Sequence, residues 1–227
     1  MEDRVLDWAV YEKTAREMAA EGLVLLKNDN KALPLKQGET VSVFGRMQNH
    51  YYKSGTGSGG MVNVARVVGL LDALNECKDV NVNQKLAETY AAWDKEHPVE
   101  LGLGWGQEPW SQAEMPVTEE LVQEAAGESD SAIVIIARTA GEDKDNTLEK
   151  GAFMLTDIET DMLRLVRENF QKMVVLLNVG GLIDMSFLDT ISPDACMYVW
   201  QGGMVGGYGV VDVLVGDVSP SGKLTDT

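Results

Sequence analysis

The sequence contains few residues that build metal or disulfide sites. Among its 227 residues, cysteine occurs only as Cys77 and Cys196, and histidine only as His50 and His97. Two cysteines cannot form a disulfide scaffold or a four-thiolate zinc site, and two histidines leave little material for a histidine-based zinc site. We therefore expect buried, reduced thiols, as in a cytosolic protein, and no bound metal ion.

Long apolar runs and positive charge are also scarce. The N-terminus lacks the basic segment and apolar run of a secretory signal peptide, and no stretch of about 18 apolar residues could span a bilayer. The 19 Lys and Arg stand against 36 Asp and Glu, a formal net charge of -17. Such a surface repels phosphate backbones and anionic lipids, so neither nucleic-acid nor membrane binding is expected. A cytoplasmic location is predicted.

The sequence does contain apolar runs that alternate with helical patterns. Strands are predicted at residues 23–26, 40–44, 132–137, 173–177 and 196–200, and helices at 5–22, 67–77, 83–96, 118–127, from 156 and 205–215. Thr156, followed by Glu159, predicts a capping box at the start of a helix. Strands that are apolar throughout favour a mostly parallel sheet covered by helices on both faces. No linker or repeat divides the chain, and the polar residues 217–227 are expected to form a tail.

Loops beyond the carboxyl ends of parallel strands are where α/β sheets bind ligands. Four loops have that position: residues 45–64, 138–155, 178–184 and 201–207. The first loop holds Arg46 and His50. These side chains could form hydrogen bonds with ligand hydroxyl groups, or they could have only a structural role. Trp105 and Trp110 could stack on a sugar, although packing is the simpler interpretation.

The first loop also holds the glycine-rich segment 54–60 (SGTGSGG). Its glycines allow close approach of the backbone to a ligand. Gly55, Gly57 and Gly60 fit G-x-G-x-x-G, but they lie about ten residues past the strand end, and no P-loop motif is present. A nucleotide site is therefore a distant alternative, and a flexible surface loop is the plainer interpretation.

The second loop carries Glu142 just past the strongest predicted strand. A carboxyl group there can act as a general acid if its surroundings keep it protonated. Several further charged residues follow it, including Asp145 and Glu149. From the chemistry alone, a solvated charge run is the favoured interpretation.

Taken in order, several segments resemble the α/β-sandwich domain of glycoside hydrolase family 3. They are residues 15–29 (AREMAAEGLVLLKND) with 33–35 (LPL), 41–45 (VSVFG), 54–59 (SGTGSG), 174–178 (VVLLN) with Gly180, 200–203 (WQGG), and 212–217 (DVLVGD) with 220–224 (PSGKL). The resemblance covers nearly the whole chain, and it implies a three-layer α/β/α sandwich with a mostly parallel sheet.

The family resemblance implies a retaining exo-β-glycosidase that hydrolyses terminal β-D-glucosides. Retention requires two carboxyl groups about 5–5.5 Å apart, a nucleophile and an acid/base. In the family the sandwich supplies the acid/base Glu from a loop similar to SGEGYDR, which here reads Ala140-Gly-Glu-Asp-Lys-Asp-Asn146. Glu142 falls on the acid/base position, with Glu149 as the fallback, and Asp145 matches the aspartate. Asp143 and Asn146 depart from the family pattern.

The same resemblance implies the rest of the site. The substrate-binding candidates are Arg46, His50, Ser54, Thr56, Ser58 and Asp145. The nucleophilic Asp belongs to a TIM-barrel domain that is absent from residues 1–227, so the barrel is the expected partner and the chain alone is expected to be inactive. No cofactor is implied, and whether the protein forms a homo-oligomer stays open. The rival is a non-catalytic carbohydrate-binding or assembly module of the same fold.

Overall fold

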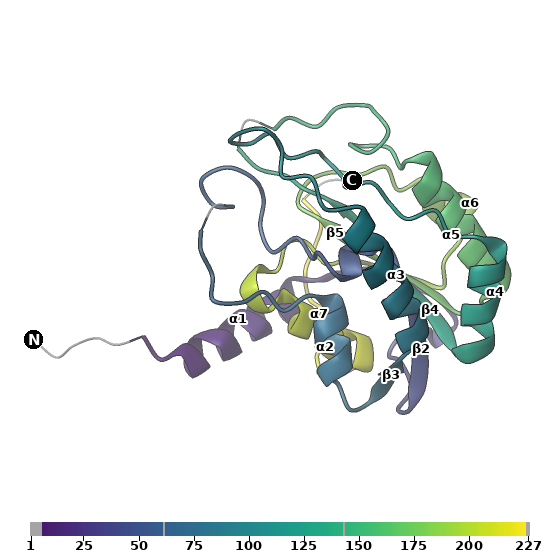
Figure 1. Cartoon of the computed structure of the whole chain (residues 1–227). Coiled ribbons are helices and arrows are strands. Elements are labelled where there is room, and N and C mark those ends of the chain that lie inside the picture. Colours follow the sequence, from purple (N-terminus) through teal and green to yellow (C-terminus); the bar gives the residue numbers. More distant parts are fainter. Residues whose placement is uncertain (1–5, 61, 143, 226–227) are drawn as a thin grey trace, which may run out of the picture.

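The computed structural model describes residues 6–60, 62–142 and 144–225 and contains a six-stranded sheet between two layers of helices (Figure 1). The strands are β1 (Val24–Asn28), β2 (Glu39–Phe44), β3 (Val80–Val82), β4 (Ser131–Arg138), β5 (Met173–Val179) and β6 (Ala195–Tyr198). The helices are α1 (Trp8–Gly22), α2 (Leu70–Glu76), α3 (Gln84–Glu96), α4 (Glu119–Glu128), α5 (Asp157–Asn169), α6 (Phe187–Thr190) and α7 (Gly206–Val215). Short 3-10 turns are η1 (Asp29–Lys31), η2 (Arg46–Gln48) and η3 (Gly203–Val205).

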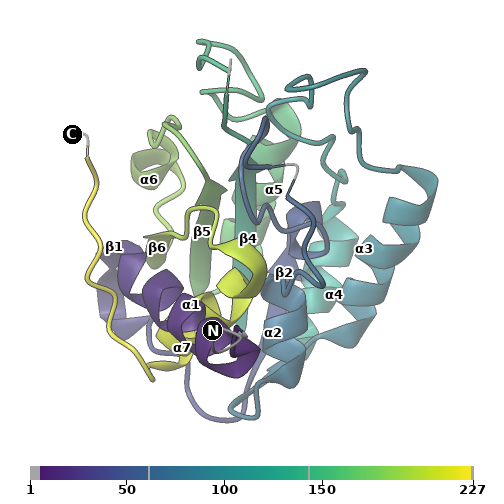
Figure 2. The ribbon, with the colours of Figure 1, turned by 90° about the vertical axis from the view of Figure 1, so that its left-hand side faces the viewer.

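The sheet has the order β1-β6-β5-β4-β2-β3. Every neighbouring pair is parallel except β1 and β6, which are antiparallel. Figure 2 shows α1, α2 and α7 in front of the sheet, with α3, α4 and α5 behind it. This arrangement confirms the predicted α/β/α sandwich with a mostly parallel sheet.

Alternation along the strands divides the interior into two apolar cores. In β4, Ile133 and Ile135 face the core beneath α1, α2 and α7, whereas Val134 and Ile136 face the core beneath α3, α4 and α5. Because both faces of β4 are covered, all eight of its residues are buried. Double coverage explains why the central strands are apolar throughout instead of alternating with polar residues.

The predicted elements are present with small shifts at their ends. The first helix begins at Trp8, where the Asp7 side chain caps it, and Val5 lies outside the described residues. The last predicted strand stops at Tyr198, since Trp200 has a positive φ of 53°. The Thr156 and Glu159 capping box is confirmed. Strand β3 and helix α6 are too short to have given a clear pattern in the sequence.

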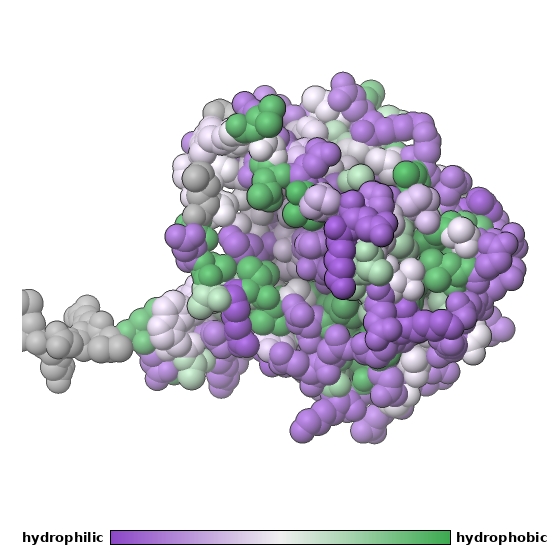
Figure 3. Space-filling view, in the orientation of Figure 1, coloured by the Kyte–Doolittle hydropathy of each residue, from purple (hydrophilic) through white to green (hydrophobic). Residues whose placement is uncertain are grey.

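The described part of residues 217–227 is anchored to the domain. Backbone N–H groups of Ser221 and Gly222 donate to the carbonyls of Glu21 and Leu23, at the end of α1. Cys196 is buried and Cys77 half-buried, and both are free thiols. Within the described residues, no helix is both long enough and apolar enough to cross a membrane. Hydrophilic residues dominate the part of the surface in Figure 3 where α3 and α4 lie.

Candidate functional site

The loops that follow the parallel strands meet at one end of the sheet, at the top of Figure 2. Asn178, fully buried near the end of β5, ties two of them to that strand. Its Oδ1 accepts from the Tyr52 N–H at 2.8 Å, and its Nδ2 donates to the carbonyls of Tyr52 at 3.1 Å and Trp200 at 2.5 Å. One side-chain amide therefore positions the loops after β2 and β6 against β5.

The glycine-rich loop pairs directly with the loop after β4. The Thr56 N–H donates to the Ala140 carbonyl at 2.6 Å, and Thr56 forms a parallel bridge with Gly141. A Cβ on Gly55 would lie 2.3 Å from the Ala140 carbonyl oxygen, and one on Gly141 would lie 2.4 Å from that of Thr56. Glycine is needed at both positions because the two backbones touch there.

This pairing brings Ser58 to Glu142, two residues that the sequence analysis assigned to the same site. The Ser58 hydroxyl donates to Glu142 Oε2 at 2.8 Å, and the Ser58 N–H donates to the same oxygen at 3.2 Å. Glu142 is exposed. The two hydrogen bonds favour its charged form and lower the pKa of Glu142 below its ordinary value.

A buried ion pair at the base of the same loop fixes how the chain leaves β4. Arg138 donates from Nη1 and Nη2 to the two oxygens of Glu159, at 2.6 and 2.7 Å, and from Nε to the Ala152 carbonyl at 2.8 Å. Arg138 is 1% exposed and Glu159 is 5% exposed. Residues 139–155 are therefore anchored at their start and at their far end. Sequence reasoning assigned Glu159 only its helix-capping role and missed this pair.

The other acidic candidates lie further along the loop. Asp145 and Glu149 are exposed, and the Glu149 carboxylate is 3.5 Å from the Thr147 hydroxyl. Asn146, which stands where the family resemblance expects Arg, donates to the Leu182 carbonyl at 2.8 Å. Asp143 lies outside the described residues. Of the two acid/base candidates, only Glu142 contacts the glycine-rich loop in the described residues.

Arg46 is buried away from the open end of the site, with 1% of its surface exposed. Its guanidinium donates to the carbonyls of Ala113 and His97 and to Asp94, at 2.8, 2.6 and 2.9 Å. It also lies over the Trp93 ring, 4.7 Å from the centroid. Because these partners surround Nη1 and Nη2, the structure favours a structural role for Arg46 over the predicted contact with substrate hydroxyls.

The buried carboxyl group of Glu114 holds the backbone of Arg46 by hydrogen bonds. The Arg46 N–H lies 3.0 Å from both carboxyl oxygens of Glu114, and the Met115 N–H donates to one of them at 2.8 Å. Burial raises the pKa of Glu114 to about 7, against the lowering effect of the two backbone donors. The sequence analysis did not single out this carboxyl group.

The remaining substrate-binding candidates occupy different settings. His50 is half-buried, with Nε2 3.1 Å from Asp94 Oδ2. The Ser54 hydroxyl accepts from Lys53 Nζ at 3.0 Å, and Thr56 is buried with 7% exposure. Three of the six candidates, Ser54, Thr56 and Ser58, therefore lie on the glycine-rich loop, while Arg46 and His50 share Asp94 beneath it.

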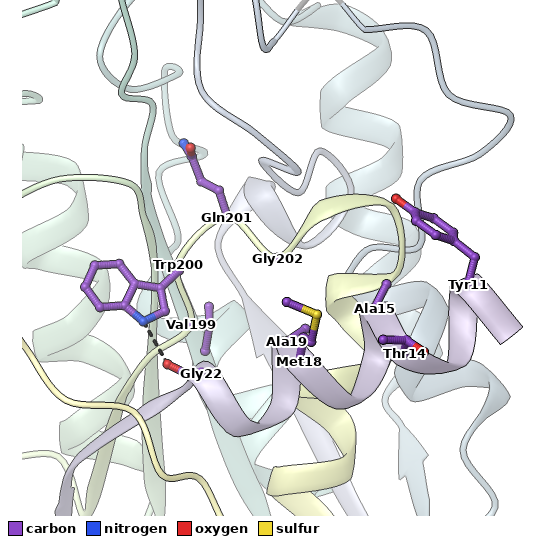
Figure 4. A pocket seen from close by; sticks show the side chains of 10 residues that line it. All are labelled: Tyr11, Thr14, Ala15, Met18, Ala19, Gly22, Val199, Trp200, Gln201 and Gly202. Carbon is purple, nitrogen blue, oxygen red and sulfur yellow. Dashed lines mark hydrogen bonds between the residues drawn. The ribbon is translucent and has the colours of Figure 1, made fainter.

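A neighbouring pocket lies between α1 and the segment after β6 (Figure 4). The Trp200 indole Nε1 donates to the Gly22 carbonyl at 3.0 Å and forms one side of the pocket. Gln201 points away from α1 in Figure 4, and a Cβ on Gly180 would lie 2.7 Å from its side chain. Gln201 therefore faces the loop after β5. Among the residues that the structure describes, no group of three or more His, Cys, Asp or Glu could hold a metal ion.

Comparisons with known proteins find relatives along nearly the whole chain. Residues 23–227 match the family model described as the glycosyl hydrolase family 3 C-terminal domain. A beta-glucosidase of Ruminococcus albus is 56% identical over 98% of this chain, which corresponds to 23% of that protein. Beta-glucosidase A of Butyrivibrio fibrisolvens is 33% identical over 93% of the chain and 28% of that protein. A periplasmic beta-glucosidase of Salmonella typhimurium is 26% identical over 95% of the chain and 28% of that protein.

Solved structures of beta-glucosidases also superpose on nearly the whole chain. A beta-glucosidase from Paenibacillus barengoltzii superposes with a TM-score of 0.93 at 51% identity, over 96% of this chain and 24% of that one. Beta-glucosidase 3B from Thermotoga neapolitana, in complex with glucose, superposes with a TM-score of 0.86 at 32% identity, over 96% of this chain and 31% of that one. The chain thus spans about a quarter of the length of the relatives it matches.

Proposed function

Because this chain belongs to the glycosyl hydrolase family 3 C-terminal domain family, we propose that it supplies the acid/base carboxyl group of a retaining β-glucosidase, and that this group is Glu142. The observation that carries the proposal is the contact of Ser58 with Glu142, which joins the glycine-rich loop to the carboxylate at the open end of the sheet. Parallel α/β sheets bind their ligands at that end.

The proposed chemistry needs Glu142 in both protonation states. As the acid, it gives a proton to the oxygen of the departing group while a second carboxylate attacks the sugar. As the base, it then takes a proton from the water that releases the sugar. In the exposed chain the Ser58 donors favour the carboxylate, which suits the second step. A neighbouring domain that covers Glu142 would exclude water and raise the pKa of the carboxyl group, which the first step requires.

The second carboxylate is assigned to the rest of a longer polypeptide. The relatives are about four times as long as the segment they share with this chain. We propose that a TIM-barrel domain packs on the loop end of the sheet and brings an Asp nucleophile about 5–5.5 Å from Glu142, the spacing that retention requires. Ser54, Thr56 and Asp145 would then line the sugar site, with His50 at its edge.

The experiment that tests this proposal compares two variants of the full-length polypeptide. Glu142→Ala should abolish hydrolysis of cellobiose, which has a poor leaving group, and added azide should partly restore turnover of activated nitrophenyl glucosides. Glu149→Ala is the matched control and should keep most of the activity. If Glu142→Ala hydrolyses cellobiose like the wild type while Glu149→Ala does not, the acid/base is Glu149.

The same experiment addresses the rival function. A full-length protein that binds β-glucosides and hydrolyses none of them would be a non-catalytic carbohydrate-binding module. The predicted cytoplasmic location stays a prediction, and cell fractionation followed by immunodetection would test it.

A further inference from the structure

Helix α1 is far more exposed than the other long helices. Of its 15 residues, all of them described, Ala20 alone is buried, whereas the 13-residue helices α3 and α5 bury three and four residues. Figure 1 shows the N-terminal half of α1 extending beyond the rest of the domain. Isolated helices shorter than about 12–15 residues are marginal in water, and most helices in proteins are stabilised by packing of an apolar face. Within the described residues, the N-terminal half of α1 lacks such packing.

Large apolar side chains line one face of this helix. Trp8, Tyr11 and Met18 are 58%, 44% and 69% exposed. Together with Ala15 they follow spacings of three and four residues, so they lie on one side of the helix, a surface that we call the α1 stripe. Figure 4 shows three of these side chains along α1. The described residues of α3 and α4 contribute no exposed large apolar side chain, and Figure 3 shows a hydrophilic surface where those helices lie.

The other side of α1 is fixed to the domain through α7. Arg16 donates from Nε to Asp212 Oδ2 at 2.6 Å and from Nη2 to Asp212 Oδ1. A Cβ on Gly209 of α7 would lie 2.8 Å from the backbone nitrogen of Ala20, so the two helices are in close contact. Because Arg16 and Ala20 face α7, that helix does not cover the α1 stripe on the opposite side.

The α1 stripe continues into the pocket between α1 and the segment after β6, a groove of about 530 Å³. Two polar groups of its wall are already engaged. The Thr14 hydroxyl donates to the Val10 carbonyl at 3.0 Å, and the Trp200 indole donates to the Gly22 carbonyl. With these groups engaged, the groove suits apolar side chains better than a hydroxyl-rich ligand, whose polar groups would lose hydrogen bonds to water there.

Trp200, at the end of the groove, has an unusual backbone conformation that the protein holds firmly. Its φ is 53°, a left-handed conformation that bulky side chains rarely adopt. Its carbonyl accepts from Asn178 Nδ2, and its indole is bonded to α1 at Gly22. Strained residues persist where their surroundings fix them, and they are concentrated at functional sites. Asn178 also holds the loop after β2, so the groove adjoins the loop end of the sheet.

We propose that the α1 stripe and its groove dock apolar side chains of the domain that carries the second carboxylate. The inference rests on the proposed function, which places that carboxylate in the rest of a longer polypeptide. In two relatives the segment shared with this chain makes up 23% and 24% of the protein, so most of the polypeptide lies outside it. A domain on the same polypeptide binds intramolecularly, whereas a second copy must come from solution. A contact on α1 besides the one at the loop end fixes the orientation of that domain, and with it the spacing of the two carboxyl groups.

The test measures whether the α1 stripe is covered in the full-length polypeptide. Met18→Cys places a thiol on the stripe, and Lys13→Cys, the matched control, places one on another side of α1. The two positions are similarly exposed in this structure, 69% for Met18 and 77% for the Lys13 side chain. In the native full-length polypeptide, Met18→Cys should react with a maleimide at least about tenfold more slowly than Lys13→Cys, because a covered thiol is not accessible to the reagent. After unfolding in urea, both variants should react at similar rates.

Mass spectrometry of the labelled peptides distinguishes the introduced thiols from Cys77 and Cys196. Equal rates for the two variants in the native protein would overturn the proposal. Slow labelling of Met18→Cys that becomes fast when the protein is diluted would also overturn it, because a second copy of the chain would then be the occupant.

The labelling needs no activity, so it separates this proposal from the acid/base assignment. The same measurement in a Glu142→Ala background should give the same protection. If Glu142→Ala still hydrolyses cellobiose while Met18→Cys is protected, the acid/base assignment fails and the docking proposal stands. If Glu142→Ala is inactive while Met18→Cys and Lys13→Cys react equally fast, the docking proposal alone fails.

Discussion

The hydroxyl and the backbone N–H of Ser58 donate to the same oxygen of Glu142, at 2.8 and 3.2 Å. The two residues are 84 positions apart in the chain. They meet because Thr56 pairs with Gly141, which aligns the glycine-rich loop with the loop after β4. The candidate acid/base is thus held by a neighbour from a different loop, and its proton affinity depends on that neighbour.

Removing the Ser58 hydroxyl should make Glu142 easier to protonate. Hydrogen bonds to a carboxylate stabilise its charged form, so Ser58→Ala should raise the pKa of Glu142 toward its ordinary value. The N–H donor remains in this variant, so part of the lowering should persist. An NMR titration of the Glu142 carboxyl carbon measures the change. Ser54→Ala is the control, and a titration curve that moves equally in both variants would contradict the assignment.

Breaking the Arg138–Glu159 pair should cost much more stability than breaking a surface pair. Arg138→Met leaves Glu159 buried without its cation, a loss of about 3–5 kcal/mol in the free energy of unfolding. Arg164→Met removes the exposed pair with Glu168 on α5 and should cost far less, because water screens an exposed ion pair. Urea denaturation of both variants checks this contrast, and similar losses would mean that the buried pair is not stronger than the exposed one.

Two adjacent glycines in the glycine-rich loop should respond differently to alanine. A Cβ on Gly60 would lie 2.0 Å from the Gly55 carbonyl oxygen, whereas one on Gly59 has nothing within 4 Å. Gly60→Ala should therefore destabilise the domain by about 1–3 kcal/mol. Gly59→Ala should change stability by less than about 1 kcal/mol. Thermal unfolding followed by circular dichroism distinguishes them, and equal melting temperatures would show that the loop can move aside.

Glu114 should make the domain less stable as the pH rises toward neutrality. Burial raises its folded-state pKa from 4.5 to about 7. The folded protein therefore keeps a proton that the unfolded chain has lost, and the contribution of this group falls between about pH 4.5 and 7. The full difference is about 3 kcal/mol.

The isosteric variant Glu114→Gln isolates that contribution. Its amide oxygen can still accept from the Arg46 and Met115 N–H groups, but it carries no proton to lose. Denaturant unfolding at several pH values should show a wild-type advantage at low pH that shrinks on approach to pH 7. Parallel pH profiles for the two proteins would mean that Glu114 does not titrate in this range.

The order of the elements was predictable from local patterns. Apolar runs such as residues 132–137 predict strands covered on both faces, because only double burial favours a strand without polar residues. The Thr156 and Glu159 capping box predicted the start of α5, because both partners lie within one helical turn. The choice of Glu142 came instead from the family resemblance, because its position just beyond a buried strand favoured, by itself, only a solvated charge run.

The contacts that shape the site could not be predicted in this way. The sequence analysis offered Arg46 as a ligand for substrate hydroxyls, but the fold buries it against Asp94 and the Ala113 carbonyl, 48 and 67 positions away. Glu108 and Tyr52 carry no local pattern that sets them apart from other polar residues in loops, yet both line one cavity.

The sequence by itself therefore determined the alternation of strands and helices and the coverage of the sheet on both faces. Each of these depends on hydrophobic periodicity or on contacts within a few residues. Only the tertiary structure decided which polar side chains hold the loops by hydrogen bonds and which have no hydrogen-bond partner in the described residues. That distinction depends on pairs such as Tyr52 and Asn178, 126 positions apart, which become neighbours only when the parallel strands align their carboxyl ends.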